Sequence, residues 1–291
     1  MGWCNPSIPF PQASIKVSVQ SYLRSVTTSR ELVAIDLVKV QPIHVTDGEI
    51  RMSTYVLCHG AWHTGKELTA VAEHIRAAGH TVHTPTLKGN RPGDSKKTTL
   101  DEAINSLVEY FTENTLTDAV LMGHSYGGMA ITGAADRLPA GSIRRLVYWN
   151  AFVPNDGESL NDMVPPHYVE LFAQLEADDG SVVLPYPIWR DAFINDANTE
   201  LAQQAYDMLN PHSNATFKDK IKLSTNPAAM EIPKSYINCT EDTALPHSLG
   251  WHPRLSEKLG LFRFVECPGS HEVCFTNPAV LAEKIVQAGR D

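Results

Sequence analysis

Residues 119–128 restrict the fold of this chain more than any other stretch, and they read Ala-Val-Leu-Met-Gly-His-Ser-Tyr-Gly-Gly. An apolar run typical of a buried strand ends in the pattern Gly-x-Ser-x-Gly, and residues compatible with a helix follow. This order predicts a sharp strand-to-helix turn with Ser125 at its tip. Gly123 and Gly127 lack a Cβ, so they allow the close backbone approach that such a turn needs. The turn would push the Ser125 hydroxyl out of the sheet and aim the first amides of the helix at the same point.

Strand and helix patterns alternate from residue 53 onward. The apolar runs that predict strands lie at 55–58, 81–83, 119–122, 145–149, 235–239 and 262–266. The segments with helical spacing lie at 67–78, 100–111, 127–137, 247–259 and 278–288. Strands that alternate with helices imply an α/β fold, in which a doubly wound, mostly parallel sheet has helices on both faces.

The stretch from about 152 to 232 breaks this alternation. Prolines punctuate it, aromatic residues are plentiful, and short helical pieces lie at 167–176 and 199–208. It begins directly after a predicted strand, and ligands of open α/β sheets bind at the carboxyl ends of the strands. We therefore interpret it as a cap over the functional site. An ordinary peripheral layer of helices is the alternative.

Residues 1–51 do not fit the pattern, since Ser, Thr and Pro are scattered among apolar residues with one weak strand-like run at 32–40. A single domain of this kind could start at Met52, directly before the first predicted strand. We expect 52–291 to be that domain and 1–51 to be an extension of doubtful structure, with Met52 as the natural start. A genuine N-terminal arm that packs on the sheet edge is the competing interpretation.

Composition limits the partners of the chain. Its 291 residues carry a formal net charge of −9 with no basic patch, which disfavours nucleic acids and anionic membranes. An apolar run of about 18 residues, the minimum for a membrane span, is missing from the sequence. The five cysteines are odd in number and form no C-x-x-C pair, which predicts free thiols in the cytoplasm. The twelve histidines show no metal-ligand spacing, so we expect no metal. The oligomeric state stays open, a homodimer included.

Candidate catalytic residues follow two later strands. A serine hydroxyl is a weak nucleophile at neutral pH, so it needs a base and a carboxylate that orients the base. With a nucleophile on a strand-to-helix turn, the order along the chain is serine, acid, histidine. Asp242 follows the strand predicted at 235–239, and His271 follows the one at 262–266. Because the ends of parallel strands share one sheet edge, we expect Ser125, Asp242 and His271 to converge.

Other residues could also supply the acid and the base. Glu241 is an alternative acid, which we interpret as a solvated loop carboxylate. His247 and His252 are alternative bases, but they fall in a predicted helix, whereas His271 follows Pro-Gly-Ser, a turn that can present a side chain. His124, which precedes the serine, is expected to pack or hydrogen bond beneath the turn.

Backbone amides would stabilise the negative oxygen of a tetrahedral intermediate. The Tyr126 N–H, directly after the serine, is the first candidate donor. The second should come from the loop after the first strand, which reads His59-Gly60-Ala61-Trp62, so we expect the Ala61 N–H to provide it. Removing one such donor typically costs about 100- to 1000-fold in rate.

Together these residues resemble the α/β-hydrolase superfamily, and most closely its branch of small esterases, which holds plant methylesterases, hydroxynitrile lyases and related bacterial esterases. The similarity spans roughly residues 53–290. The motifs that carry it are Leu-Cys-His-Gly-Ala-Trp at 57–62, Gly-His-Ser-Tyr-Gly at 123–127, Val-Tyr-Trp-Asn-Ala-Phe-Val-Pro-Asn-Asp-Gly at 147–157, Tyr-Ile-Asn-Cys-Thr-Glu-Asp at 236–242 and Pro-Gly-Ser-His at 268–271.

The resemblance implies an eight-stranded sheet with a helical cap after the sixth strand. It implies Ser125, Asp242 and His271 as a catalytic triad, without metal or organic cofactor. The lyases of this branch carry a lysine after the catalytic histidine, where this chain has Glu272, and a threonine where it has Ala61. Both departures favour hydrolysis over cyanohydrin cleavage. Relatives with an aspartate nucleophile are excluded by Ser125.

We therefore expect a serine carboxylic-ester hydrolase that acts on a small, mostly apolar ester. Lactones and activated amides would use the same apparatus and are not separated from esters by the sequence. Three other functions stay open. The first is a hydroxynitrile-lyase-like enzyme of the same fold, which the two departures disfavour. The fold also supports cofactor-free oxygenation of a heteroaromatic compound by a His–Asp pair, and it supports receptors that bind a ligand without turnover.

Overall fold

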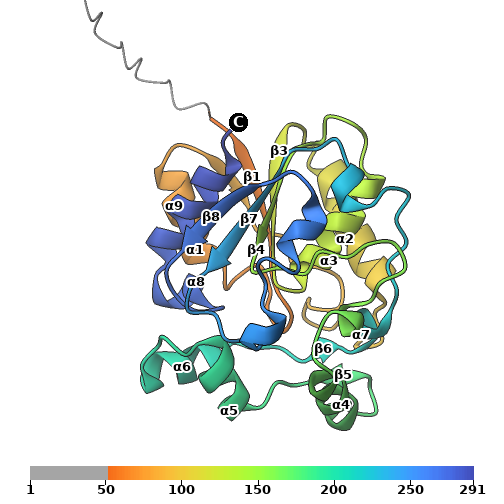
Figure 1. The fold of residues 1–291 in the computed structure, drawn as a ribbon, viewed down its shortest axis with the longest axis vertical. Helices are drawn as coiled ribbons and strands as arrows, with labels where there is room; N and C mark the ends of the chain where they lie inside the picture. Colours follow the sequence, from red (N-terminus) through yellow and green to blue (C-terminus); the bar gives the residue numbers. More distant parts are fainter. Residues whose placement is uncertain (1–51) are drawn as a thin grey trace, which may run out of the picture. The chain divides into compact units, whose positions relative to one another are not determined.

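The computed structural model describes residues 52–291, so the predictions for 1–51, including the start at Met52, lie outside the described residues. Its main sheet is wholly parallel, with the strand order β2-β1-β3-β4-β7-β8 (Figure 1). The strands are β1 (Thr54–Cys58), β2 (Thr81–His83), β3 (Ala119–His124), β4 (Ile143–Trp149), β7 (Lys234–Cys239) and β8 (Arg263–Cys267). The chain winds from β1 to one edge and then from β3 to the other, which confirms the doubly wound α/β prediction.

The number of strands differs from the eight that the resemblance implied. Within residues 52–291 the main sheet has six strands. The remaining two, β5 (Ser181–Val182) and β6 (His212–Ser213), form a separate antiparallel pair outside that sheet.

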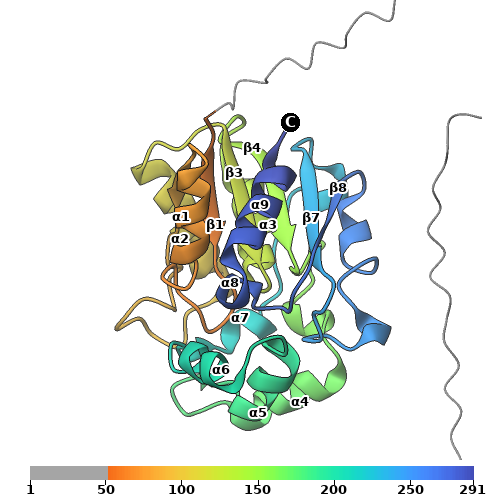
Figure 2. The same cartoon turned by 90° about the vertical axis from the view of Figure 1, so that its left-hand side faces the viewer.

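Helices cover both faces of the sheet. On one face lie α1 (Thr69–Ala77) and α9 (Pro278–Gly289), and on the other lie α2 (Leu100–Glu113) and α3 (Gly127–Arg137), as Figures 1 and 2 show. Strand β1 shows why two layers form, since Tyr55 and Leu57 pack in the α1/α9 layer while Val56 and Cys58 pack in the α2/α3 layer. The side chains of a strand alternate between its faces, so a run of apolar residues needs cover on both.

The start of α2 shows how local sequence sets an element. Thr99 caps the helix by accepting from the Glu102 N–H, and the Glu102 carboxylate accepts in turn from the Thr99 N–H. This reciprocal pair satisfies two backbone donors that the first turn would otherwise leave free.

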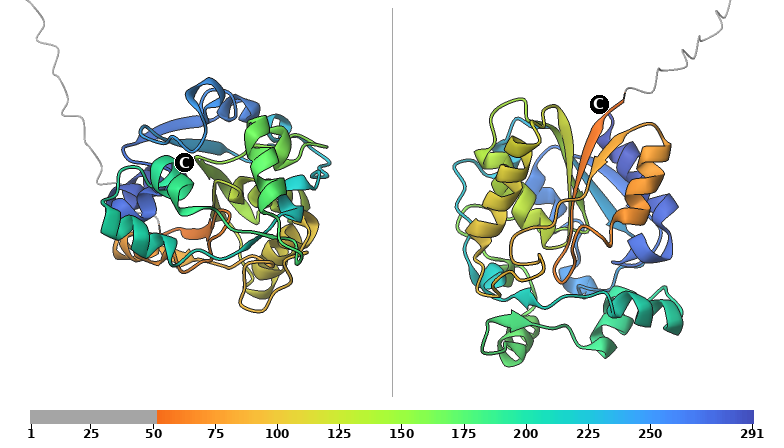
Figure 3. Two further views of the ribbon diagram at one scale, coloured as in Figure 1. Left: turned by 90° about the horizontal axis from the view of Figure 1, so that it is seen from below. Right: turned by 180° about the vertical axis from the view of Figure 1, so that it is seen from behind.

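Most of the segment between β4 and β7 lies across the carboxyl ends of the strands, at the bottom of Figure 1 and of the right-hand view of Figure 3. Its helices are α4 (Pro166–Leu175), α5 (Tyr186–Ile188), α6 (Thr199–Tyr206) and α7 (Ala215–Lys218), with a π-helical turn at Trp189–Phe193 and 3-10 turns at Leu160–Asp162 and Pro227–Ala229. We call 150–233 the insertion. It places aromatic side chains above the end of β3.

The helix predicted at 247–259 is wrong. The structure has two short 3-10 turns, His247–Leu249 and Ser256–Leu259, with irregular backbone between them. Gly250 favours non-helical backbone, and Pro253 lacks the N–H that a continuous helix requires.

No helix within residues 52–291 combines the length and the apolar character that a membrane crossing demands.

Candidate active site

Ser125 lies in the turn between β3 and α3, at the carboxyl edge of the sheet. Its φ of 52° falls in the left-handed region, which is uncommon for any residue other than glycine. Neighbouring glycines make this conformation possible. A Cβ on Gly127 would lie 2.7 Å from the His59 carbonyl oxygen, and one on Gly123 would lie 2.7 Å from the Gly127 carbonyl oxygen. The predicted turn, with two required glycines and a serine at its tip, is therefore confirmed.

Asp242 and His271 meet at the same edge, from the loops that follow β7 and β8. The His271 Nδ1 lies 2.6 Å from the Asp242 Oδ2, and both side chains are buried. The other carboxylate oxygen of Asp242 accepts from the Ala244 N–H at 2.8 Å. With Nδ1 held by the carboxylate, the His271 ring has its Nε2 left for other chemistry.

The rival residues lie elsewhere. Glu241 is exposed, and its backbone N–H donates to the Gly269 carbonyl at 3.0 Å. His247 is exposed, while the His252 Nδ1 lies 2.6 Å from the Ser256 hydroxyl. His124 is buried beneath the turn, where its ring stacks on Trp149 at 3.8 Å. Of these residues, none contacts the imidazole of His271 except His124, whose ring centroid lies 4.6 Å from that of His271.

The surroundings of His271 raise the pKa of its imidazole. Burial lowers its pKa, but the charge and hydrogen bond of Asp242, with a smaller contribution from Glu272, outweigh burial and raise the pKa above 6.5. His124 differs, because burial holds its pKa well below 6.5 and keeps that ring neutral. The site thus combines one basic imidazole with one neutral imidazole.

The Ser125 hydroxyl itself makes no hydrogen bond within residues 52–291. The structure therefore pairs Asp242 with His271 and places Ser125 at the same sheet edge, while the contact between Ser125 and His271 stays a prediction. Hydrogen bonds at catalytic sites are often loose without substrate and tighten when it binds.

Two backbone amides near Ser125 have no acceptor in the described part of the chain, namely those of Ala61 and Tyr126. Tyr126 precedes the first residue of α3, so its N–H belongs to the unpaired donors of a helix start. Gly60 packs against the turn, since a Cβ there would meet the Ser125 Cβ at 3.3 Å. These are the two donors that the sequence predicts for an oxyanion, and their role stays a prediction.

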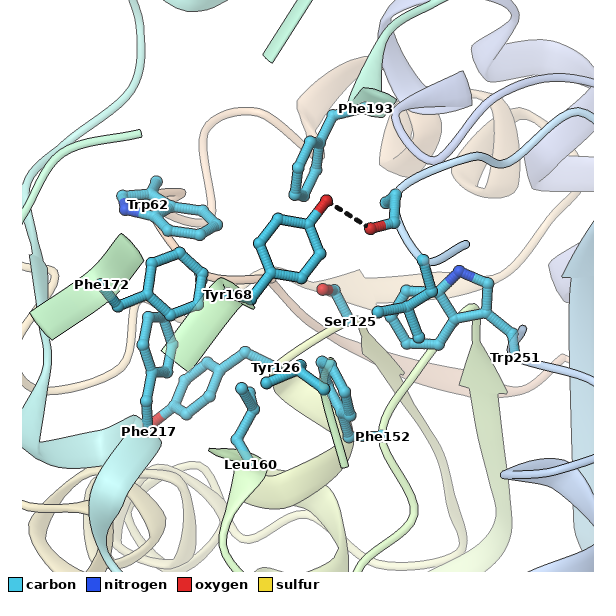
Figure 4. Close-up of a pocket in the computed structure, with 14 residues that line it drawn as sticks. Trp62, Ser125, Tyr126, Phe152, Leu160, Tyr168, Phe172, Phe193, Phe217 and Trp251 are labelled. Carbon is cyan, nitrogen blue, oxygen red and sulfur yellow. Dashed lines mark hydrogen bonds between the residues drawn. The ribbon is translucent and has the colours of Figure 1, made fainter. Parts of the chain in front are cut away.

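A narrow pocket opens at Ser125. Figure 4 shows the Ser125 hydroxyl among aromatic rings that come from the insertion and from the loops at the strand ends. Its lining residues are Ala61, Trp62, Ser125, Tyr126, Phe152, Leu160, Val164, Tyr168, Phe172, Phe193, Phe217, Ala244, Leu245 and Trp251. None of these carries a charge, and the Tyr168 hydroxyl already donates to the Ala244 carbonyl at 2.9 Å. The pocket therefore suits an apolar group.

Asn150 is a site residue that sequence reasoning missed. It follows β4 with a φ of 37°, is fully buried, and donates from its side-chain nitrogen to the Asp242 Oδ2. Its side-chain oxygen accepts from the Cys239 N–H at 2.8 Å. Asn150 thus joins the end of β4 to the end of β7 and fixes the carboxylate. The available signal was an amide residue directly after a buried strand, at the first position of the insertion.

Replacing Asn150 with alanine is expected to lower the free energy of unfolding by about 1–3 kcal/mol. The change leaves the buried Cys239 N–H without its acceptor and removes a donor from Asp242. Urea denaturation measures the loss. Asn114→Ala is the control, since Asn114 is exposed and bonds only to the Tyr110 carbonyl of its own helix, and we expect it to cost about 0.5 kcal/mol or less. Equal losses of unfolding free energy in Asn150→Ala and Asn114→Ala would contradict the role assigned to Asn150.

One group of metal-ligand side chains lies in the described residues. His124, His271 and Glu272 offer ligand atoms within 4.8 Å of one another. Each group already has a protein partner, however. The His124 Nε2 hydrogen bonds with the His271 carbonyl at 3.0 Å, the His271 Nδ1 binds Asp242, and the Glu272 Oε2 lies 3.5 Å from the His63 Nε2. The group is explained by these contacts, and we assign no ion to it.

Comparisons with known proteins place this site in a family. The family model described as the alpha/beta hydrolase family matches residues 55–284. A carbendazim hydrolyzing esterase of Nocardioides is 32% identical over 252 residues, which is 82% of this chain and 100% of that protein. A pyrethroid hydrolase of Sphingobium wenxiniae is 26% identical over 79% of this chain and 85% of its own length.

Solved structures agree with these relatives. An extracellular alpha/beta-hydrolase from a Paenibacillus species is 37% identical and superposes with a TM-score of 0.79, over 82% of this chain and 100% of that one. The methylesterase MES16 from Arabidopsis has a TM-score of 0.67 at 20% identity, over 81% and 98% of the two chains, and shows the shared fold. The chain therefore belongs to the alpha/beta hydrolase family, as an ester-hydrolysing enzyme.

Proposed function

We propose that the protein is a serine esterase that hydrolyses a small, mostly apolar ester through an acyl-enzyme. The observation that carries this proposal is the buried hydrogen bond of 2.6 Å between His271 and Asp242, at the edge of the sheet where the turn presents Ser125. The relatives that are named for the hydrolysis of carbendazim and of pyrethroids support ester cleavage in general.

In the proposed reaction the Ser125 oxygen attacks the ester carbonyl carbon while the His271 Nε2 takes the hydroxyl proton. The carbonyl oxygen becomes negative and accepts from the N–H groups of Ala61 and Tyr126. His271 then gives its proton to the leaving alcohol, and the acyl group stays on Ser125. A water molecule, deprotonated by His271, attacks the acyl-enzyme and releases the acid. Asp242 holds the imidazole in the required tautomer throughout.

The pocket supports an apolar acyl or alcohol group. Aromatic side chains line most of it, and a charged group would enter without a counter-ion among the lining residues. Burying an unpaired charge costs several kcal/mol, which is a factor of about 100 or more in kcat/KM.

A panel of p-nitrophenyl and methyl esters with graded acyl size tests the proposal. We expect a burst of p-nitrophenol equal to one enzyme equivalent, followed by slower steady release, because the acyl-enzyme accumulates. Neutral p-nitrophenyl butyrate should be preferred over the p-nitrophenyl hemiester of succinic acid by about 100-fold. Absence of turnover across the whole panel, or preference for the charged ester, would overturn the proposal. Consumption of dioxygen with a heteroaromatic substrate would instead favour the oxygenase function.

The proposal also predicts the pH dependence of turnover. His271 acts as a base only when neutral, and its pKa is raised above 6.5 by Asp242. We expect kcat/KM to rise with pH through an apparent pKa above 6.5 and then to level off. Removing the carboxylate charge, as in Asp242→Asn, should move the residual profile to lower pH. A wild-type profile that is flat between about pH 5 and 9 would show that no histidine acts as the base.

A further inference from the structure

Trp62, next to the proposed oxyanion donor Ala61, has an unusual backbone. Its φ of 62° is left-handed, a conformation that bulky residues rarely adopt without support from their surroundings. Trp62 is nevertheless 5% exposed and packs among aromatic rings, with the ring centroids of Phe217 and Phe172 at 5.7 Å and 5.9 Å from its own. Some set of contacts must therefore hold the loop in this conformation.

The insertion provides those contacts. The Trp62 carbonyl accepts from the Asn210 N–H at 2.7 Å, and the indole N–H donates to the Val182 carbonyl at 3.0 Å. The Trp62 backbone N–H donates to the Nδ1 of His212 at 3.4 Å. Every polar group of Trp62 thus binds the insertion, and in Figure 4 its indole nitrogen points away from Ser125.

The Nδ1 of His212 accepts the hydrogen bond from the Trp62 N–H, and only one tautomer of the His212 ring allows this. Its Nε2 lies 2.9 Å from the Thr216 hydroxyl, which itself donates to the Ser213 carbonyl at 2.8 Å. The Nε2 must therefore carry the proton, and Nδ1 is an acceptor for the Trp62 N–H and for the Asn90 side chain at 3.2 Å. Burial holds the pKa of His212 well below 6.5, so the ring stays neutral.

His212 also contacts the residue that carries the other proposed donor. Its ring packs edge-on against the ring of Tyr126, with centroids 4.8 Å apart. One buried side chain from the insertion therefore contacts Tyr126, which carries one proposed donor, and Trp62, the residue directly after the other proposed donor, Ala61. On the other side of the loop, the His63 Nδ1–H donates to the Ala61 carbonyl at 2.7 Å.

We propose that His212 is a positioning residue for the oxyanion site, through which the insertion holds the Ala61 N–H in its productive direction. This inference rests on the proposed serine-esterase function. It makes the insertion part of the catalytic apparatus as well as the roof of the pocket. The oxyanion donor is then in place only when β6 is docked on the loop after β1.

Two substitutions at His212 separate positioning from packing. In His212→Asn the side-chain oxygen takes the place of Nδ1 and keeps an acceptor for the Trp62 N–H. In His212→Gln the longer side chain reaches toward Thr216 and the acceptor at the Nδ1 position is lost. We expect kcat to fall by about 10- to 100-fold in His212→Gln with KM nearly unchanged, and by less than about 3-fold in His212→Asn. Equal losses in both variants would overturn the proposal.

Asn198→Ala serves as the control for general weakening of the insertion. Asn198 is exposed and caps α6 by accepting from the Leu201 N–H at 2.8 Å, and it has no contact with Trp62. We expect it to lower the melting temperature without the selective loss of kcat. A loss of kcat in Asn198→Ala equal to that in His212→Gln would mean that insertion stability, not His212, sets the rate, and would overturn the proposal.

Amide hydrogen exchange in the wild-type protein tests the same contact without any variant. The Trp62 N–H should be protected to the same degree as the β5–β6 pair, because it opens only when the insertion leaves the loop. The Ala61 N–H, which has no acceptor, should exchange much faster. Rapid exchange at Trp62 beside a protected β5–β6 pair would overturn the inference. Failure of the ester panel would reject the proposed function alone, since the exchange result does not depend on turnover.

Discussion

Replacing Ser125 with alanine is expected to lower kcat/KM for the best ester of the panel by on the order of 10⁴-fold or more. In the proposed reaction the hydroxyl oxygen bonds to the acyl carbon, and alanine has no group that can take its place at the tip of the turn. The residual rate should come from the oxyanion donors and the pocket, which bind the ester without an acyl-enzyme. Steady-state kinetics with p-nitrophenyl esters measure the loss, and the burst should disappear.

Two controls accompany this variant. The melting temperature of Ser125→Ala should stay close to that of the wild type, since both residues have the same backbone constraint at a φ of 52°. Ser224→Ala removes an exposed hydroxyl that donates to Asp136 at 2.7 Å, outside the pocket lining, and should change kcat/KM by less than about 2-fold. If Ser125→Ala kept a tenth of the activity, Ser125 would not be the nucleophile.

Replacing Asp242 with asparagine is expected to lower kcat by about 10⁴-fold. An amide at this position donates as well as accepts, so it favours the wrong tautomer of His271 and no longer stabilises the imidazolium. The effect should be accompanied by the pH shift described above, because Asp242 raises the pKa of His271. Stopped-flow measurement of the burst separates loss of acylation from loss of deacylation.

The neighbouring carboxylate provides a matched control for this change. Glu241→Gln removes one negative charge a single residue away, but Glu241 is exposed and only its backbone contacts the Gly269 loop. We expect kcat to change by less than about 2-fold. Equal losses of kcat in Asp242→Asn and Glu241→Gln would mean that the loop acts through its overall negative charge and not through the hydrogen bond between Asp242 and His271.

The parts of the fold that could be predicted are those in which the spacing of apolar residues along the chain identifies a strand or a helix. The apolar spacing of β3 fits a strand, and that of α2 fits a helix. The turn between β3 and α3 follows from two glycines and a serine. Asp242 and His271 are candidates because the ends of parallel strands share an edge. The preference for them over Glu241, His247 and His252 comes from the predicted local structure at each position. The resemblance supplied the family, which the comparisons confirm.

The parts that could not be predicted depend on contacts between distant segments. Asn150 and Asp242 are 92 positions apart, and the position of Asn150 directly after a strand does not identify Asp242 as its partner. Trp62 and His212 are 150 positions apart, and both read locally as packing residues. Contacts of this kind arise from the tertiary fold and not from local preference. The helix predicted at 247–259 fails for a different, local reason, because Gly250 and Pro253 interrupt a segment whose apolar spacing is helical.

The central claim is that a covalent acyl group forms on Ser125, and mass spectrometry tests it most directly. The protein is treated with a fluorophosphonate, digested and mapped, in parallel with Ser125→Ala and with wild type protected by excess ester. We expect one adduct per chain on the peptide that contains Ser125, absent from the variant and formed more slowly in the presence of the ester. Full ester turnover by a protein that carries the label on another residue, or carries no label, would contradict it.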